Sequence, residues 1–359
     1  HSRNYKVRIN TLINGNPIAE VDFNANHLRL FLAFNKRDVI GGNDAYEPIA
    51  HESGVERKKV KAFINVGLNN QSFEATKQGL NPKHPFSQFR AGNLQSLQKP
   101  GLLDALKRFY VDEYSADRMA LVVLGEESLD ALEAMVRSRF SEVPNRNLGP
   151  GYLNLPLFDV KRLPLVVQSR PVSESRRMTL MFPVPDTDAF AGQAPLRYVG
   201  HLLGHEGEGS LLAYLKAEGL ANALSAGESL GMTESRSFAI SVSLTAQGFT
   251  ERDRVIQAIF NTIRTLEANG VDAWRFDELK TMAEANFRFA EESSPQGLVT
   301  QLADLMHTVP ASELFTRGRL YTQFDGDLVR DVLTWLGPEQ MLLLVTSPEV
   351  DTDAVTTHY

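Results

Sequence analysis

Two histidines at helical spacing, His201 and His205, are the residues of this chain best placed for chemistry. Residues four positions apart lie on the same face of a helix, so the two imidazoles could share one metal ion. The glutamate of an H-E-x-x-H motif is absent, because Leu202, Leu203 and Gly204 separate the histidines. A zinc site also needs a third protein ligand. We therefore favour a peptide-contacting surface, or a plain structural helix, over a metal site.

The stretch from Tyr198 to Ala226 must position these histidines. Its pattern predicts a helix with both histidines on one face, a glycine-rich break at 206–210, a second helix over Leu211–Glu218 and a strand over Asn222–Ala226. Glycine lets backbone come close to a partner because it has no Cβ. We call this stretch the ledge. A strand edge beside it could add a peptide strand through main-chain hydrogen bonds.

Composition and charge exclude several classes of function. The chain has 359 residues, enough for two domains of ordinary size. Its net charge of −7 gives no basic surface for nucleic acid or acidic lipid. No apolar run approaches the roughly 20 residues that a bilayer span needs. We expect neither a nucleic-acid nor a membrane partner.

The sequence leaves the compartment open. The polar start, His1 to Asn4, shows no signal peptide. There are no cysteines, which excludes disulfides, thiolate metal sites and a cysteine nucleophile. A cysteine-free protein is compatible with both cytoplasm and periplasm.

The first half of the chain alternates strand and helix patterns. In chain order we predict strands at 5–12 and 18–23 around an Asn14-Gly15 hairpin turn, a polar helix over 56–80, a proline-stiffened loop over 81–89, a helix over 102–110, a buried strand over 119–124 and a helix over 129–140. The run Met119–Leu124 is continuously apolar, as is typical of a buried strand. We expect His84 to make a hydrogen bond that ties its loop together.

The second half repeats this order of strands and helices. We predict strands at 165–168, 178–182, 237–244 and 341–346 and helices at about 250–268, 272–293 and 297–307. The chain therefore reads as α+β, with two similar domains at 1–150 and 160–359 and a boundary near 145–160. Each domain should be a mainly antiparallel sheet with helices packed on one side.

No complete active site is visible in the sequence. The strings H-x-x-E-H, G-x-S-x-G and the P-loop pattern are all absent. We therefore assign no catalytic residue and no metal ligand.

Several motifs together resemble the insulinase/pitrilysin family of zinc metallopeptidases, the inverzincins. They are Asn81-Pro82-Lys83-His84-Pro85-Phe86-Ser87, Gly92-Asn93, Tyr114-Ser115, Phe182-Pro183-Val184-Pro185-Asp186, Gly200-His201-Leu202-Leu203-Gly204-His205-Glu206-Gly207 and Asn286-Phe287-Arg288-Phe289. The resemblance runs from about residue 70 to the end of the chain and is greatest for the N-terminal half of insulin-degrading, pitrilysin-like members.

This resemblance implies a zinc-dependent metalloendopeptidase, a hydrolase that degrades peptides or small unfolded proteins in an enclosed chamber. A C-terminal half or a second subunit would close the chamber. Zinc would be the cofactor, held by an inverted H-x-x-E-H helix and a downstream glutamate. By the same resemblance the ledge is an exosite that binds the substrate, and its residues are Gly200, His201, Gly204, Glu206, Leu224, Ser225 and Ala226, with Arg197 and Glu228 at further lining positions.

Departures from the family pattern leave two hypotheses open. The H-x-x-E-H helix is not in this chain, so it either precedes His1 or is lost. The downstream glutamate should fall within 56–66, where Val60 and Val66 occupy the expected positions and Glu56 is the only acid. The chain is then either half of an active zinc peptidase or a catalytically inactive homologue that acts as a peptide-binding or structural half. The valines favour the second hypothesis.

Overall fold

The structure is a computed structural model that describes residues 12–13, 16–17, 76–87, 97–151, 155–171, 174–232, 235–269, 271–291 and 293–353. The chain divides into two compact units, residues 1–70 and 71–359. In the first unit, β1 (Leu12–Ile13) pairs antiparallel with β2 (Asn16–Pro17), so paired residues flank the predicted Asn14-Gly15 turn. The other predictions for residues 5–75 lie outside the described residues.

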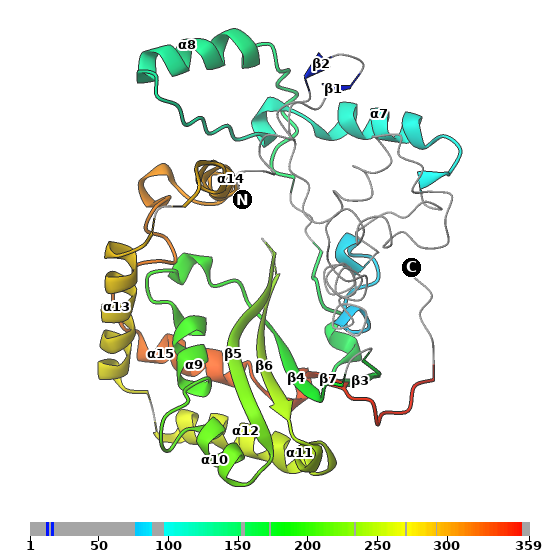
Figure 1. Ribbon diagram of the computed structural model, residues 1–359, viewed down its shortest axis with the longest axis vertical. Coiled ribbons are helices and arrows are strands. Elements are labelled where there is room, and N and C mark those ends of the chain that lie inside the picture. The colour runs from blue at the N-terminus through cyan, green and yellow to red at the C-terminus, as the bar shows by residue number, and fades with distance from the viewer. Residues whose placement is uncertain are drawn as a thin grey trace, which may run out of the picture. The chain divides into compact units, whose positions relative to one another are not determined.

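A five-stranded sheet organises the second unit (Figure 1). Its strands are β3 (Leu165–Ser169), β4 (Arg177–Val184), β5 (Ala221–Met232), β6 (Ser235–Leu244) and β7 (Leu342–Thr346), in the order β3-β7-β4-β6-β5. Only β3 and β7 run parallel. The mainly antiparallel sheet predicted for this part of the chain is confirmed. Among the described strands β5 pairs with β6 alone, so it forms an edge of the sheet.

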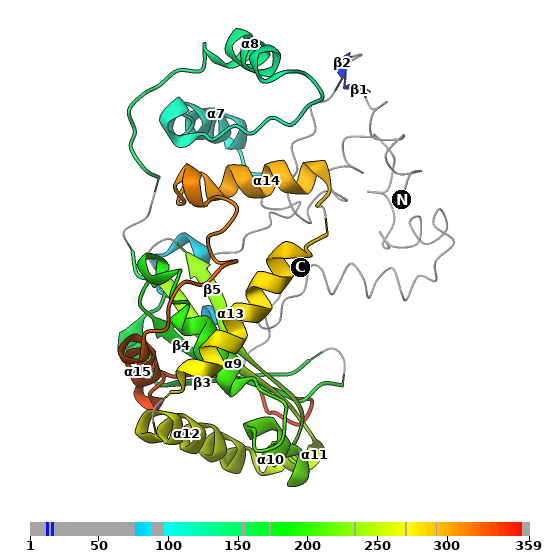
Figure 2. The same cartoon turned by 90° about the vertical axis from the view of Figure 1, so that its left-hand side faces the viewer.

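Helices pack on one face of this sheet (Figures 1 and 2). These helices are α9 (Pro195–Leu203), α10 (Leu211–Ala217), α11 (Ala246–Thr250), α12 (Arg252–Asn269), α13 (Ala273–Arg288) and α15 (Gly326–Thr334). A further helix, α14 (Pro295–Leu305), buries no residue. None of the described helices is both long and apolar enough to cross a bilayer. Short 3₁₀ turns occupy Pro85–Ser87, Ala116–Arg118, Val160–Arg162, Asp188–Phe190, Ala311–Glu313 and Pro338–Gln340.

Alternation along β6 sends one set of side chains into the main core. Phe238, Ile240 and Val242 are fully buried, whereas Ser241 and Ser243 on the opposite face are half-buried. Burying each such apolar side chain contributes about 1.5–3 kcal/mol. The main core also takes residues from β4 and the helices, among them Met178, Leu180, Phe182, Tyr198, Leu203, Leu215, Val255 and Ile259. A smaller cluster comprises Leu80, Leu157, Phe158, Met181, Leu342 and Leu344.

The predicted helix over 272–293 is too long. α13 ends at Arg288, and the next helix begins with Pro295 at its first turn. The residue before a proline is disfavoured in helical conformation, so the chain leaves the helix before Ser294. The Ser294 hydroxyl then caps α14 by accepting a hydrogen bond from the Gly297 N–H at 3.2 Å.

The buried strand predicted at 119–124 is wrong. These residues form no strand, and most are exposed, Leu124 at 57%. The flanking helices α7 (Leu102–Glu113) and α8 (Leu129–Phe140) lie where predicted, but neither buries a residue. An apolar run forms a strand only where a neighbouring strand pairs with it, and no strand within 76–87 or 97–151 does so. The domain limits at 1–150 and 160–359 stay predictions.

Polar contacts tie the 3₁₀ turn after α7 to the loop after α8. Arg118 donates through Nε to the Gly149 carbonyl at 2.8 Å, and the Gly149 N–H donates to Asp117 Oδ2 at 2.8 Å. A hydrogen bond from the Ser115 hydroxyl lowers the pKa of Asp117 below its usual range. The carboxylate therefore stays charged at neutral pH and can hold the loop.

The proline-stiffened loop is closed by its histidine, as predicted. His84 is buried, and its Nδ1 accepts a hydrogen bond from the Phe86 N–H at 3.1 Å. Asn81 secures the start of the loop, because its Oδ1 accepts from the Lys83 N–H at 3.1 Å.

A close approach between α9 and β5 depends on glycine. A Cβ at Gly200 would lie 2.9 Å from the Ala226 carbonyl oxygen and 3.1 Å from the Gly227 Cα. A Cβ at Gly204 would lie 3.5 Å from the Ala226 nitrogen. The two backbones are therefore in direct contact, which only glycine permits at Gly200.

We predict that Gly200→Ala destabilises the protein by about 1–3 kcal/mol, because the added methyl group must displace backbone atoms of β5. The helix propensity of alanine offsets only about 1 kcal/mol of this cost. Chemical denaturation would measure the change. Gly297→Ala is the matched control, since its Cβ meets only the Ser294 hydroxyl and the variant should be as stable as wild type or more so. Equal stabilities for Gly200→Ala and wild type would contradict the close approach.

Candidate functional site

A pocket of about 920 Å³ lies beside the edge strand β5. Its walls are α9, β5, α13 and the segment 318–321. Every residue predicted for the ledge site lines this pocket, namely Arg197, Gly200, His201, Gly204, Glu206, Leu224, Ser225, Ala226 and Glu228. The structure therefore brings the whole predicted set together, from α9 and the residues after it and from β5. Their role in binding a substrate stays a prediction.

One face of α9 forms the first wall. Positions 197, 200, 201 and 204 follow the helical period and face the pocket, while Tyr198 and Leu203 are fully buried on the other side. Pro195 occupies the first turn, where its missing N–H costs nothing. The helix ends before Gly204, and Ser210 starts α10 by accepting a hydrogen bond from the Ala213 N–H at 3.1 Å. The break predicted between the two helices is confirmed.

The edge strand β5 forms the second wall. Its register with β6 is regular from Ala223 to Glu228 and shifts between Glu228 and Gly231. At that irregularity the Leu230 N–H donates to the buried Ser237 hydroxyl at 2.8 Å. Leu224 lies on the edge strand rather than in mid-sheet, and its side chain is buried in the core. The pocket therefore runs along a regular, edge-forming stretch of backbone.

Aromatic rings fix the walls from behind. The Tyr198 ring on α9 lies 6.0 Å from the Phe276 ring on α13 and 5.7 Å from the Phe324 ring, measured between centroids. Phe276 also contacts Tyr321 of the pocket lining, at 6.3 Å. The Tyr198 hydroxyl donates to the Asp272 carbonyl at 2.7 Å, and burial raises the pKa of Tyr198 to about 12. The hydroxyl therefore keeps its proton and remains a donor.

The two histidines are held close together at the pocket. Their ring centroids lie 6.2 Å apart, with the planes 57° from one another. Burial lowers the pKa of His201, and the neighbouring His205 lowers it further. His201 is therefore neutral at pH 7, where an unperturbed imidazole near pKa 6.5 would carry partial charge.

The described residues do not fit the zinc site that the resemblance implies. Across the described ranges no group of three or more His, Asp or Glu side chains could hold a metal ion. His201 and His205 lack the third protein ligand that zinc requires. Glu56, Val60 and Val66 lie outside the described residues.

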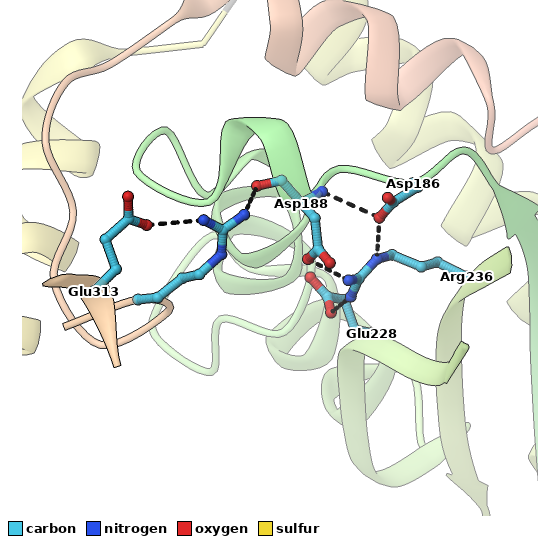
Figure 3. Close-up of polar contacts among 6 residues, drawn as sticks. Asp186, Asp188, Glu228, Arg236 and Glu313 are labelled. Atoms are coloured by element: carbon cyan, nitrogen blue, oxygen red, sulfur yellow. Dashed lines mark hydrogen bonds and ion pairs between the residues drawn. The ribbon is translucent and has the colours of Figure 1, made fainter. Parts of the chain in front are cut away.

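An arginine lies among three carboxylates at the Glu228 end of the pocket (Figure 3). Arg236 binds Asp186 through Nε at 2.8 Å, Glu228 through Nη1 at 3.2 Å and Asp188 through Nη2. Burial lowers the pKa of Arg236, but the hydrogen bond to Asp186 and the charges of Asp188 and Glu228 outweigh it and raise this pKa overall. The guanidinium is therefore always charged and is bound by all three carboxylates.

Sequence reasoning missed the other walls of the pocket. α13 contributes Leu279, Met282, Ala283, Asn286 and Phe287, and the segment 318–321, which follows α14, contributes Gly318, Arg319 and Tyr321. The helical spacing of the α13 set could have indicated a common face. The loop residues carry no periodic signal. His205 and Gly227 also line the pocket.

Comparisons with known proteins agree with this fold. A family profile described as "Peptidase M16 inactive domain" matches residues 102–283, and one described as "Middle or third domain of peptidase_M16" matches 287–359. The crystal structure of pitrilysin superposes with a TM-score of 0.73 and 25% identity, over 84% of this chain and 34% of that one. A peptidase M16 inactive domain from Pseudomonas fluorescens shares the fold, with a TM-score of 0.56 at 18% identity, over 83% of this chain and 71% of that one.

Curated relatives point the same way. The A-factor-processing enzyme of Saccharomyces cerevisiae is 33% identical over 348 residues, which are 92% of this chain and 34% of that enzyme. Human insulin-degrading enzyme is 36% identical over 282 residues, 77% of this chain and 28% of that enzyme. The chain thus spans about a third of the length of these relatives. It belongs to the M16 (insulinase/pitrilysin) peptidase family, in the branch of insulin-degrading enzyme.

Proposed function

We propose that this chain is a peptide-binding half of an M16 peptidase and that it holds extended polypeptide in the pocket along β5. The observation that carries the proposal is the edge of β5 between Leu224 and Ala226, which has no second partner among the described strands and lines a pocket of about 920 Å³. An edge strand presents a row of N–H and C=O groups that an extended peptide can pair with. Main-chain pairing would give affinity for many sequences.

The other pocket walls would contact the side chains of the bound peptide. Successive side chains of an extended strand point to opposite sides. Apolar residues of α13, such as Met282 and Phe287, lie in the pocket with the charged Arg197, Glu206 and Arg319. We therefore propose that the pocket accepts both apolar and polar peptide side chains, as suits a substrate class of peptides and small unfolded proteins.

Peptide hydrolysis is an activity of the full-length relatives, and this chain spans about a third of their length. The alternative function, half of an active zinc metalloendopeptidase, requires zinc ligands that the described residues do not supply. The match of 102–283 to an inactive-type domain favours the binding role. Under either alternative we propose that a C-terminal half or a second subunit closes the chamber over the bound peptide.

The first prediction from this proposed function concerns strand addition. A fluorescent, extended peptide should bind the full chain, and N-methyl groups on one set of alternate residues should weaken binding about tenfold, because each removes a main-chain donor. Fluorescence polarisation would measure the affinities. The same peptide methylated on the other alternate set is the control and should keep most of its affinity, because those N–H groups point away. Equal effects from both sets would argue against pairing with β5.

The second prediction concerns pH. His201 has a lowered pKa in the pocket, and a peptide that covers the pocket would lower it further by desolvation. Binding therefore favours the neutral imidazole, so affinity should be full above pH 6.5 and fall as the pH drops through the lowered pKa. We expect binding to be about threefold weaker at pH 5.5 than at pH 7.5. His201→Gln should reduce this ratio, whereas His307→Gln, an exposed histidine on the surface, should not. An unchanged ratio in His201→Gln would refute the assignment.

The third prediction separates binding from catalysis. The sequence of this chain contains no H-x-x-E-H string, so it supplies neither the general base nor the histidine pair of an inverzincin. We expect purified chain with added Zn²⁺ to bind peptides without hydrolysing them. Mass spectrometry of an insulin-sized peptide after prolonged incubation would test this. Cleavage that disappears on adding a chelator would show instead that the chain is catalytic.

A further inference from the structure

We infer that Arg236 is a positioning residue of the pocket, which holds the Glu228 carboxylate against β6 and so keeps the pocket from selecting basic peptide side chains. The effect on peptide binding rests on the proposed function. The structural part, that Arg236 positions Glu228, depends only on contacts within the chain. Arg236 itself does not line the pocket, whereas Glu228 does.

The geometry gives Arg236 control over Glu228. The guanidinium donates from Nη1 to Glu228 Oε2 at 3.2 Å, and its side chain is only 18% exposed against 47% for Glu228. The planar fork is already fixed by Asp186 at 2.8 Å and by Asp188. A guanidinium presents five donors in a rigid arrangement, so bonds to two carboxylates orient the third. Glu228 therefore takes the position that the fork allows.

The same cluster connects two walls of the pocket, β5 and the segment 318–321. Arg317 donates from Nη2 to the Asp188 carbonyl at 2.6 Å and from Nη1 to Glu313 at 2.8 Å. Arg317 directly precedes Gly318 and Arg319, which line the pocket. Figure 3 shows this series of contacts from Glu313 to Glu228. Asp188 thus contacts both arginines: its carboxylate binds Arg236, and its backbone carbonyl accepts a hydrogen bond from Arg317.

Removing the arginine should redirect Glu228. Asp186, Asp188 and Glu228 share one cation, so without it three like charges would repel one another. Glu228 comes from the β5 wall and is the member that can turn into the pocket. A free carboxylate there would attract a lysine side chain of a bound peptide, and salt would screen the attraction.

The experiment uses the full chain and a set of extended fluorescent peptides in which one lysine replaces alanine at successive positions. Wild type should bind the set with similar affinities. Arg236→Gln should favour a lysine at one position by about three- to tenfold over alanine, and this preference should shrink at high salt. Adding Glu228→Gln to Arg236→Gln should abolish the preference. Arg236→Lys, which keeps the charge without the fork, should show a smaller preference.

Arg176→Gln is the matched control. Arg176 also binds a carboxylate, from Nε to Glu349 Oε1 at 2.8 Å, but it does not line the pocket beside β5. The Arg176→Gln variant should bind the peptides with similar affinities, as wild type does. A preference that is absent in Arg236→Gln, or that persists in the double variant, would overturn the inference.

Hydrogen exchange without peptide tests the structural part separately. Arg236→Gln should speed amide exchange in 227–231 relative to Arg176→Gln, because Glu228 loses its ion pair. Exchange in 313–321 should also quicken, because Asp188, whose carbonyl accepts from Arg317, loses its own ion pair with Arg236. If the wild-type chain binds no peptide, the proposed function is wrong. The hydrogen-exchange result alone then tests whether Arg236 positions Glu228. Unchanged exchange in both segments would overturn it even where peptides bind.

Discussion

The contact between the backbones of α9 and β5 is the constraint on which the pocket depends. A Cβ at Gly200 would lie only 2.9 Å from the Ala226 carbonyl oxygen, so the absence of a side chain there lets the helix approach the strand this closely. Any larger residue would move α9 away from the strand, since backbone atoms of a sheet have little freedom to shift. The helix must then lie where it forms a wall beside the sheet edge, and the face with Arg197 and His201 must turn toward the pocket.

The walls are fixed by two different kinds of interaction. Behind the pocket, the rings of Tyr198, Phe276 and Phe324 pack together and join α9 to α13 and to the segment that precedes α15. At one end, Arg236 and Arg317 connect β5, the β4–α9 loop and the segment 313–317. Both interactions exist before a peptide arrives, so binding need not order the walls. Such preorganisation lowers the entropic cost of association.

Local patterns predicted the helix, the glycine break and the strand on one side of the site, the family resemblance predicted the residues there, and neither predicted the other side. His201, Gly204 and Leu224 lie within a short stretch, where helical spacing and glycines indicate both the helix face and the approaching strand. Met282 and Arg319 reach the same pocket from elements far along the chain, and no local pattern encodes that meeting. The strand predicted at 119–124 was wrong for a related reason. An apolar run shows that a segment avoids water, but pairing depends on a neighbour that its own sequence does not contain.

Buried residues are concentrated in one part of the described chain, and the pocket lies on that part. The helices α7 and α8 bury no residue, and within 97–151 only Ser115 is buried. The apolar cores comprise residues of the 76–87 and 155–353 ranges, including Tyr198 and Phe276 directly behind the pocket. Segments with few buried apolar contacts open at lower free energy than a core does, so the walls of the pocket and the edge of β5 lie on the part of the described chain that opens least readily.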